Sequence, residues 1–311
     1  MPMRTITIAT RNSPLALHQA ETVRARLLAG RDDLQVGLLE IVSAGDKTLD
    51  APLSHSGGKG LFLKELEQAL LRGDADLAVH SMKDVTVELP DGLVIGAICA
   101  RDDPRDAFVS NHFAALSQLP RGARVGTCSL RRQCQIRARF PHLRLVNLRG
   151  NINTRLAKLD RGEFDGIVLA AAGLARLGLI HRIAEPLAAE TCLPAAGQGA
   201  IGIECRADAA DARALIAPLD DADSALCVAA ERAVNKRLDG GCQSPAAAYA
   251  QLRGDQIAVR GLVGETDGSR ILYACAAGHR AQAIEFAHAC ADDLIAQGGG
   301  EILARLRDDA E

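Results

Sequence analysis

The sequence predicts a mixed α/β protein that ends in a smaller α+β domain, and three observations support this. Apolar runs of strand length alternate with helical patterns from residue 5 to about residue 205. After residue 239 the order changes to three strand patterns with Gly-Asp and Asp-Gly turns, followed by two helical patterns. These patterns cover residues 246–253, 256–263, 270–275, 281–296 and 300–308. The length of 311 residues is enough for two or three domains that each bury a core.

The first α/β unit consists of a strand at 5–9, a helix at 14–28 and a second strand at 34–42. Ser13 and the proline after it predict the helix start, because serine caps free N–H groups and proline fits the first helical position. Since helix N-termini that follow a strand attract anions, Arg11 and Ser13 are candidate anion contacts. A capping serine beside a solvated arginine explains the two residues equally well.

A glycine-rich stretch at residues 53–62 carries Lys59 and leads into a helical pattern at 61–71. Its spacing differs from the G-x-x-x-x-G-K-[ST] pattern of a phosphate loop. The glycines would permit a mobile flap that carries Lys59. A flexible turn before the helix is the simpler interpretation, and the spacing slightly favours it.

The densest group of ionisable residues, His-Ser-Met-Lys-Asp at 80–84, follows a buried strand predicted at 76–79. Polar residues at the carboxyl end of a strand in an α/β protein are typical of a functional site. Asp84, beside Lys83, is a candidate general acid or base. A surface Lys–Asp turn is the structural alternative, and such a pair contributes almost nothing to stability.

The net charge of −3 hides a basic middle of the chain. Residues 101–182 contain 14 Arg and one Lys against six acidic residues, a local charge of +9 that leaves −12 for the rest. Arginine suits planar carboxylates and phosphates, so we expect an anionic ligand. Nucleic acid is the first rival, but aromatic residues make up only 3% of the chain and no stacking platform or helix-turn-helix pattern is present. The four phenylalanines of this region have the spacing of core residues: Phe108, Phe113, Phe140 and Phe164.

Five arginines fall at or near strand-to-helix junctions that follow strands predicted at 123–126, 144–148 and 166–170: Arg131, Arg132, Arg149, Arg155 and Arg176. Ser129 is predicted to cap a helix that reaches residue 140. The first two arginines then stand in the first turn of that helix, where the helix dipole disfavours cations. An anion held by both guanidinium groups would explain this placement. Cys128 lies at the same electropositive position and is a rival reactive thiol.

Two segments, 101–106 and 194–202, are predicted to cross between domains. The second contains a formal G-x-G-x-x-G at 197–202. A dinucleotide-binding fingerprint requires a helix after these glycines, whereas here a strand pattern follows at 200–205. We therefore reject dinucleotide binding.

Cys242 lies on a tight loop after a helical pattern at 224–238. Gly240 and Gly241 are predicted to end this helix in the left-handed conformation, and Pro245 prevents a restart. Three other cysteines fall in apolar or strand-like runs and are predicted core residues: Cys99, Cys205 and Cys275. Cys242 is therefore the thiol that the pattern presents to a cleft, and an inert buried or surface thiol is the alternative.

The nine cysteines form no C-x-x-C pair, and the histidines show no metal-ligand spacing. Reduced thiols are therefore expected rather than disulfides or a metal site. No stretch approaches the ~20 apolar residues that span a bilayer, and the first apolar run is too short for a signal peptide. We expect a cytoplasmic protein without a membrane partner.

Eight motifs in chain order make the sequence similar to the porphobilinogen deaminase (hydroxymethylbilane synthase) family. They are R-x-S-P-L-A-L at 11–17, G-G-K-G-L-F at 57–62, H-S-M-K-D-V at 80–85, D-P-R-D-A-F-V at 103–109, S-L-R-R-Q at 129–133, L-R-G-N at 148–151, L-P-A-x-G-Q-G at 193–199 and G-G-C-Q at 240–243. Each motif alone is weak evidence, but their order over the whole chain is specific. Four positions depart from the usual family pattern: His55, Thr86, Cys128 and Asn153.

The resemblance implies two α/β domains of the type II periplasmic-binding-protein kind, followed by a small domain that carries Cys242. The implied boundaries are residues 1–99 with 200–217, residues 100–199, and residues 218–311. The resemblance also implies a monomer that condenses four porphobilinogen molecules head to tail, releases ammonia, and then hydrolyses the product to hydroxymethylbilane. A dipyrromethane cofactor, one per chain, would be attached to Cys242 by a thioether.

The resemblance further assigns roles to the candidate residues. Asp84 would be the catalytic carboxylate, which stabilises positive charge on the pyrrole N–H groups, and Lys59 would belong to a flap. Residues implied to hold the carboxylates of the cofactor are Lys83, Ser129, Arg131, Arg132 and Arg155. Residues implied to bind the substrate are Arg11, Ser13, Arg149 and Arg176. The main alternative is a non-catalytic protein of the same two-domain fold that binds anionic solutes, and a second is an enzyme that uses Cys128.

Overall fold

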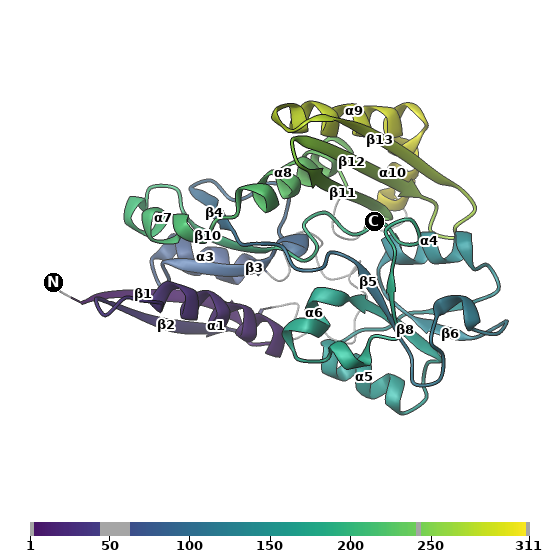
Figure 1. Ribbon diagram of the computed structural model, residues 1–311, viewed down its shortest axis with the longest axis horizontal. Helices are drawn as coiled ribbons and strands as arrows, with labels where there is room; N and C mark the ends of the chain where they lie inside the picture. Colours follow the sequence, from purple (N-terminus) through teal and green to yellow (C-terminus); the bar gives the residue numbers. More distant parts are fainter. Residues whose placement is uncertain (1–2, 44–62, 241–243, 309–311) are drawn as a thin grey trace. The chain divides into compact units, whose positions relative to one another are not determined.

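The computed structural model describes residues 3–43, 63–240 and 244–308 of the chain (Figure 1). The chain divides into two compact units. Unit 1 comprises Met1–Arg101 and Ala200–Ala225, and unit 2 comprises Asp102–Gly199 and Leu226–Glu311. The two predicted crossing segments, 101–106 and 194–202, each contain one of the boundaries between these units.

Unit 1 is built on a five-stranded sheet in the order β2-β1-β3-β10-β4. Its strands are β1 (Arg4–Arg11), β2 (Leu34–Ile41), β3 (Leu77–Ser81), β4 (Leu93–Ile98) and β10 (Ile201–Arg206). Strands β2 and β3 are parallel to β1, whereas β10 is antiparallel to β3 and β4. The helices of this unit are α1 (Pro14–Leu28), α3 (Lys64–Arg72) and α7 (Ala210–Ile216), with 3-10 turns η2 (Met82–Asp84) and η5 (Ala217–Leu219).

Unit 2 contains a second five-stranded sheet in the order β7-β6-β8-β5-β9. Its strands are β5 (Asp106–Val109), β6 (Arg124–Gly126), β7 (Arg144–Val146), β8 (Gly166–Ala170) and β9 (Glu185–Leu187). The connecting helices are α4 (Leu130–Arg139), α5 (Ile152–Asp160) and α6 (Ala171–Arg176), with 3-10 turns η3 (Leu116–Gln118) and η4 (Ile180–Arg182). As in unit 1, the strand in the fourth position of the sheet, here β5, is antiparallel to both of its neighbours. The two sheets thus share the same arrangement of parallel and antiparallel strands.

A three-stranded antiparallel sheet forms the C-terminal part of unit 2. Its strands are β11 (Ala246–Arg253), β12 (Gln256–Gly264) and β13 (Ile271–His279), with helices α9 (Ala283–Ala296) and α10 (Gly299–Asp308), the turn η6 (Arg280–Gln282), and the preceding helix α8 (Ala222–Arg237). Val259, Ala287 and Leu294 belong to one core shared by the sheet and these helices. The predicted mixed α/β architecture is therefore confirmed: two α/β sheets with their helices are followed by a small α+β part.

Two short strands were not predicted, and others, such as β3 and β13, extend further than predicted. Strands β5 and β9 have only four and three residues, which is too short for a periodic pattern to identify. Strand β3 continues to Ser81, so His80 lies within the strand rather than after it. Pairing with β10 explains this extension, because Ser81 and His80 lie opposite Ile201 and Gly202.

The end of helix α8 differs from the prediction in which residue is left-handed. Asp239 has φ of 48°, whereas Gly240 does not have a positive φ. The N–H of Gly240 donates to the carbonyl of Asn235 at 2.9 Å, which is the long hydrogen bond of a Schellman cap. The helix therefore ends one residue earlier than expected, with an aspartate in the strained position.

The prediction for the three strand cysteines is confirmed for Cys99 and Cys205, which are buried, and wrong for Cys275, which is exposed. Strand β13 alternates, with Leu272 and Ala274 buried and Tyr273 and Cys275 facing solvent. Apolar residues on both faces of a strand do not show which face is covered, because this depends on which side the helices pack.

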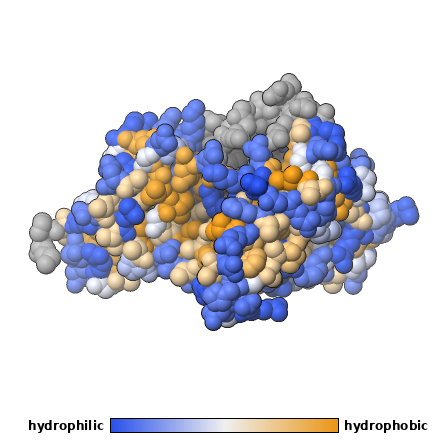
Figure 2. Space-filling view, turned by 90° about the horizontal axis from the view of Figure 1, so that it is seen from above, coloured by the Kyte–Doolittle hydropathy of each residue, from blue (hydrophilic) through white to orange (hydrophobic). Residues whose placement is uncertain are grey.

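Figure 2 shows one face of the molecule, where apolar residues form several patches interrupted by hydrophilic ones. The large exposed apolar side chains of the described residues come from many elements: Met3, Val42, Leu71, Ile180, Tyr273, Ile284 and Ile295. Scattered exposed apolar residues are normal for a folded protein. In the described residues, no helix has the length and apolar character needed to cross a membrane.

Candidate functional site

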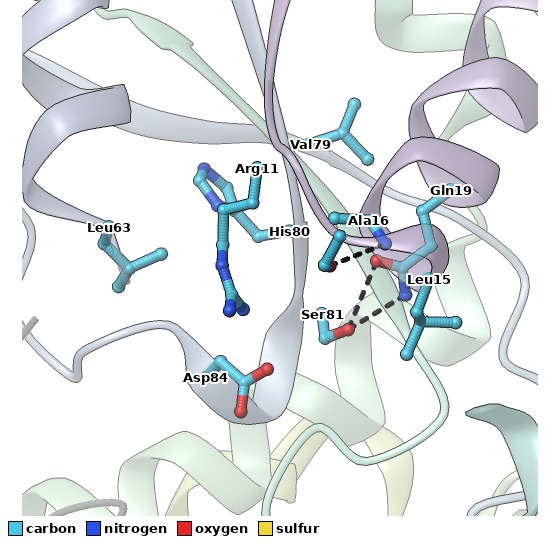
Figure 3. Close-up of a pocket in the computed structure, with 10 residues that line it drawn as sticks. Arg11, Leu15, Ala16, Gln19, Leu63, Val79, His80, Ser81 and Asp84 are labelled. Carbon is cyan, nitrogen blue, oxygen red and sulfur yellow. Dashed lines mark hydrogen bonds between the residues drawn. The ribbon is translucent and has the colours of Figure 1, made fainter. Parts of the chain in front are cut away.

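A pocket in unit 1 lies where β1 and β3 end and α1 begins (Figure 3). Strand β1 contributes Arg11, the start of α1 contributes Ser13, and β3 with its following turn contributes His80, Ser81 and Asp84. The other lining residues are Leu15, Ala16, Gln19, Leu63 and Val79. The pocket therefore combines one guanidinium group, one imidazole and one carboxylate at the carboxyl ends of two parallel strands, where α/β proteins bind ligands.

The start of α1 confirms the predicted cap. Ser13 has extended backbone angles, its Oγ accepts from the N–H of Ala16 at 3.3 Å, and proline follows at the first helical position. In Figure 3 the side chain of Arg11 extends toward Asp84. Gln19, from the second turn of α1, donates a hydrogen bond from Nε2 to Oγ of Ser81 at 2.9 Å (Figure 3). These contacts fix the helix N-terminus against the end of β3.

Asp84 is the last residue of the 3-10 turn η2, and the residue that begins this turn is firmly anchored. Met82 is almost fully buried, and its N–H donates to the carbonyl of Ala200 at 3.0 Å. A Cβ on Gly202 would overlap the sulfur of Met82, so only glycine at 202 leaves room for this side chain. Within the described residues no group donates a hydrogen bond to the carboxylate of Asp84, which is half-buried. Both of its oxygens are thus available to a ligand.

A buried ionisable pair behind this pocket is not evident from the sequence. His80 Nε2 lies 2.9 Å from Glu204 Oε2, and their side chains are 3% and 1% exposed. Glu67 of α3 is also buried, and burial followed by the charge of Glu204 raises its pKa. The only signal in the sequence was a glutamate within the apolar run at 200–205. A carboxylate bonded to one ring nitrogen fixes the orientation of an imidazole.

A second charged group lies at the start of α4 in unit 2. Ser129 caps this helix by accepting from the N–H of Arg132, as predicted. Arg131 and Arg132 are buried, and both bind Asp106, whose side chain is 0% exposed. Nη1 of Arg131 donates to Oδ2 at 2.8 Å, while Nε and Nη2 of Arg132 donate to Oδ1 at 3.0 and 2.7 Å. These contacts hold the pKa of Asp106 far below its usual range despite burial, which alone would raise it.

Two further segments contact the same carboxylate. Gln198 Nε2 donates to Oδ1 of Asp106 at 3.0 Å, and the thiol of Cys192 lies 3.2 Å from Oδ2. Asp106 therefore ties β5 to α4 and to the segment that leads out of unit 2. Two cations in the first turn of a helix are unfavourable, and from the sequence a ligand anion was expected to stabilise them. The structure shows that Asp106, an acid of the chain itself, supplies part of this stabilisation.

The remaining predicted arginines also interact with other groups of the chain. Arg176 donates from Nε to Asp102 at 2.8 Å and from Nη2 to the carbonyl of Gly199 at 2.7 Å. Arg155 donates from Nε to the carbonyl of Gly150 at 2.7 Å. Arg149 and Lys83 are half-buried, and each interacts with other groups of the chain.

The structure thus places the predicted residues in two groups, one in each unit. Unit 1 holds Arg11, Ser13, Lys83 and Asp84, and unit 2 holds Ser129, Arg131, Arg132, Arg149, Arg155 and Arg176. Lys59 and Cys242 lie outside the described residues, so their predicted roles stay predictions. Cys128 is half-buried beside the cap of α4.

Comparison with known families covers most of the chain. Residues 6–214 match the family described as porphobilinogen deaminase, dipyrromethane cofactor binding domain. Residues 225–296 match the family described as porphobilinogen deaminase, C-terminal domain.

Several solved structures are similar in fold at low identity. A putative methionine-binding lipoprotein from Bacillus subtilis is 15% identical, with 76% of this chain and 96% of that chain covered and a TM-score of 0.43. A periplasmic substrate-binding protein of an ABC transporter from Coxiella burnetii is 14% identical, with 71% and 94% covered and a TM-score of 0.43. A nutrient-binding protein from Burkholderia cenocepacia bound to methionine is 15% identical, with 68% and 90% covered and a TM-score of 0.42.

Proposed function

The chain belongs to the porphobilinogen deaminase family, and we propose that it joins four porphobilinogen molecules head to tail and then releases hydroxymethylbilane by hydrolysis. Members of this family are transferases of tetrapyrrole synthesis. The observation that carries the proposal is the pocket of unit 1, where the carboxylate of Asp84, which no group of the described residues binds, lies with Arg11 at the ends of two strands. We further propose that the protein works as a cytoplasmic monomer without a nucleic-acid or membrane partner.

Asp84 is the proposed catalytic residue. When the C–N bond of porphobilinogen breaks, the electron pair leaves with ammonia and positive charge develops on the pyrrole. A fixed carboxylate beside the pyrrole N–H stabilises this charge more in the transition state than in the ground state. A carboxylate oxygen of Asp84 also exchanges a proton with the leaving amine. The anchored Met82 turn supports this role, because it holds the carboxylate in one place.

The family binds a dipyrromethane cofactor, and the first matched domain is its binding domain. The charges of unit 2 fit such a ligand: Arg131 and Arg132 share one carboxylate, so this buried group keeps one positive charge for an acetate or propionate. When bound, the cofactor supplies the pyrrole carbon to which new units are added. Residues proposed to hold its carboxylates are Lys83, Ser129, Arg131, Arg132 and Arg155. Cys242 is proposed to carry the cofactor through a thioether.

Porphobilinogen itself carries two carboxylates, which require cationic partners. We propose Arg11, Ser13, Arg149 and Arg176 as substrate-binding residues and Lys59 as a flap residue. Arg176 can still bind a ligand carboxylate, because its hydrogen bonds within the described chain use only two of the five N–H groups of its guanidinium. The other N–H groups can bind a carboxylate that arrives from solvent.

Two measurements test the proposal. The intact mass of the denatured protein should exceed that of the bare chain by two pyrrole units, and the denatured protein should give a pyrrole-specific colour reaction. The native protein should release ammonia from porphobilinogen. A bare mass with no colour, together with binding but no ammonia release, would identify a solute-binding protein and refute the proposal.

A further inference from the structure

The two arginines at the start of α4 use different edges of their guanidinium groups. Arg132 engages all three of its nitrogens: Nε and Nη2 donate to Asp106, and Nη1 donates to the carbonyl of Val168 at 2.9 Å. Arg131 uses only Nη1, which contacts Asp106 at 2.8 Å, the carbonyl of Leu193 at 2.7 Å and the sulfur of Cys192 at 3.6 Å. Nε and Nη2 of Arg131 have no acceptor in the part of the chain that the structure describes. This pair of N–H groups forms the edge that binds a carboxylate side-on.

The charges of this buried group do not balance. Two guanidinium groups share one carboxylate, and their other partners within the described residues are neutral amide, carbonyl and thiol groups. Burial and the nearby Asp106 raise the pKa of the Cys192 thiol, so this group stays uncharged. Since a buried charge without a counterion is costly, the remaining positive charge calls for an anion. The Nε–Nη2 edge of Arg131, which lacks an acceptor among the described residues, is where that anion can bind.

We propose that Asp106 is a positioning residue of the cofactor site: by holding Nη1 of Arg131, it leaves the Nε–Nη2 edge of that guanidinium to bind a carboxylate of the ligand. Arg131 then makes the direct side-on contact, whereas Arg132 acts mainly through Asp106. This inference rests on the proposed function, since the ligand carboxylate is that of the dipyrromethane. The family resemblance assigns Arg131 and Arg132 the same role in binding the cofactor, whereas the proposal gives them different roles.

A purely structural role is the competing explanation, because Asp106 also ties β5 to α4 and to Cys192 and Gln198. The two explanations differ in one respect. A structural tie would lower ligand retention only as far as it lowers folding stability. A positioning residue would lower ligand retention in chains that are folded.

The test compares Asp106→Asn with Glu231→Gln in the purified full chain. Glu231 is a matched control, because it is a fully buried carboxylate of unit 2 that accepts from the N–H of Gly197 at 2.6 Å and of Ala250 at 2.9 Å. In the described chain neither arginine of the pair donates to Glu231. Folded chains are isolated by size-exclusion chromatography, and intact mass then gives the fraction that carries the two-pyrrole adduct.

Both variants should have a lower unfolding midpoint. Asp106→Asn should also lower the adduct fraction of folded chains about tenfold or more relative to Glu231→Gln, because losing a charge-assisted hydrogen bond weakens binding by this order. Equal adduct fractions in the two variants would overturn the inference. A bare mass for the wild-type chain would instead refute the proposed function, and the inference with it.

Arg131→Lys and Arg132→Lys provide an independent comparison if Asp106→Asn fails to fold. Lysine keeps the charge but has no side-on edge. Arg131→Lys should lose the adduct with a small change in the unfolding midpoint, because only Nη1 is engaged within the protein. Arg132→Lys should lower the midpoint more and the adduct fraction less. Equal effects of the two substitutions on both quantities would contradict the proposed division of roles.

Discussion

Asp84 shows how a local turn fixes a functional group. The buried Met82 and the glycine that makes room for it hold the turn, so the carboxylate need not be held by a hydrogen bond of its own. This arrangement leaves both oxygens for the substrate. Since no group of the described residues binds this carboxylate, it is the candidate in this pocket for direct contact with a substrate.

We expect Asp84→Asn to slow turnover by about 10²–10⁴-fold while binding of porphobilinogen changes little. The amide keeps the shape of the side chain but loses the negative charge that stabilises the developing cation. Ammonia release measured at saturating porphobilinogen gives the effect. Asp91→Asn, at an exposed position of the same unit, is the control and should turn over at the wild-type rate. Near-normal turnover of Asp84→Asn would refute the assigned role.

Glu67 has a pKa raised mainly by burial and next by the charge of Glu204, with His80 acting in the opposite direction. Because its pKa is higher in the folded than in the unfolded state, the native state loses stability as pH rises through the unfolded pKa toward the folded one. Glu67→Gln should therefore stabilise the protein at neutral pH. The gain should vanish at pH values below the unfolded pKa of about 4.3.

Unfolding midpoints measured across pH test this prediction. Glu40→Gln is the control, because Glu40 is exposed on β2 and its replacement should leave the pH dependence unchanged. A Glu67→Gln variant whose midpoint falls at neutral pH would show that the negative charge of Glu67 is stabilising.

At the scale of the elements, the central strands of unit 2 are packed without spare volume. A Cβ added to Gly166 of β8 would lie 2.8 Å from Cζ of Phe108 and closer still to Cε2, and Phe108 is fully buried on the neighbouring strand β5. This contact explains why glycine stands in a strand, where it is otherwise unfavourable.

Gly166→Ala should therefore destabilise the protein by about 1–3 kcal/mol, the usual cost of overpacking a core. Chemical denaturation should be followed by circular dichroism, because the chain contains no tryptophan whose fluorescence could report unfolding. Gly37→Ala is the matched control: Gly37 also lies in a strand, but its added Cβ would have no neighbour within 4 Å. A loss of stability in the control equal to that in Gly166→Ala would refute the packing argument.

Helices and strands that are marked by a capping residue or by a clear apolar pattern were predicted well. The caps at Ser13 and Ser129 are confirmed, and so are the strand over 166–170 and the helix start at Pro14. Strands β5 and β9 were missed because four and three residues are too few to show a reliable alternation of apolar and polar residues. The left-handed residue at the end of α8 was misplaced because glycine is the usual choice there, whereas here Asp239 occupies it.

At the scale of the whole molecule, the basic middle of the chain should make function depend on salt. Residues 101–182 carry a local charge of +9, and the proposed ligands carry two carboxylates per ring. Raising NaCl from about 50 to about 500 mM shortens the Debye length from ~14 to ~4 Å, so KM for porphobilinogen should rise several-fold. The unfolding midpoint should change little, because the Asp106 pair is buried and poorly screened.

Initial rates at several porphobilinogen concentrations, measured at both salt concentrations, provide the test. The ionic strength is matched with a second salt to separate screening from specific ion effects. A KM that does not change with salt would argue against long-range electrostatic attraction by the basic region.

The sequence by itself determined the order of the longer strands and helices, the caps at Ser13 and Ser129, the family and the candidate catalytic carboxylate, because all of these depend on neighbouring residues or on ordered motifs. Only the tertiary structure decided which charges meet: Asp106 with arginines 25 and 26 positions later, and His80 with Glu204, 124 positions later. It also decided that Cys275 is exposed. The physical reason is that periodicity and capping act within a few residues, whereas partners across a sheet are set by strand order and register.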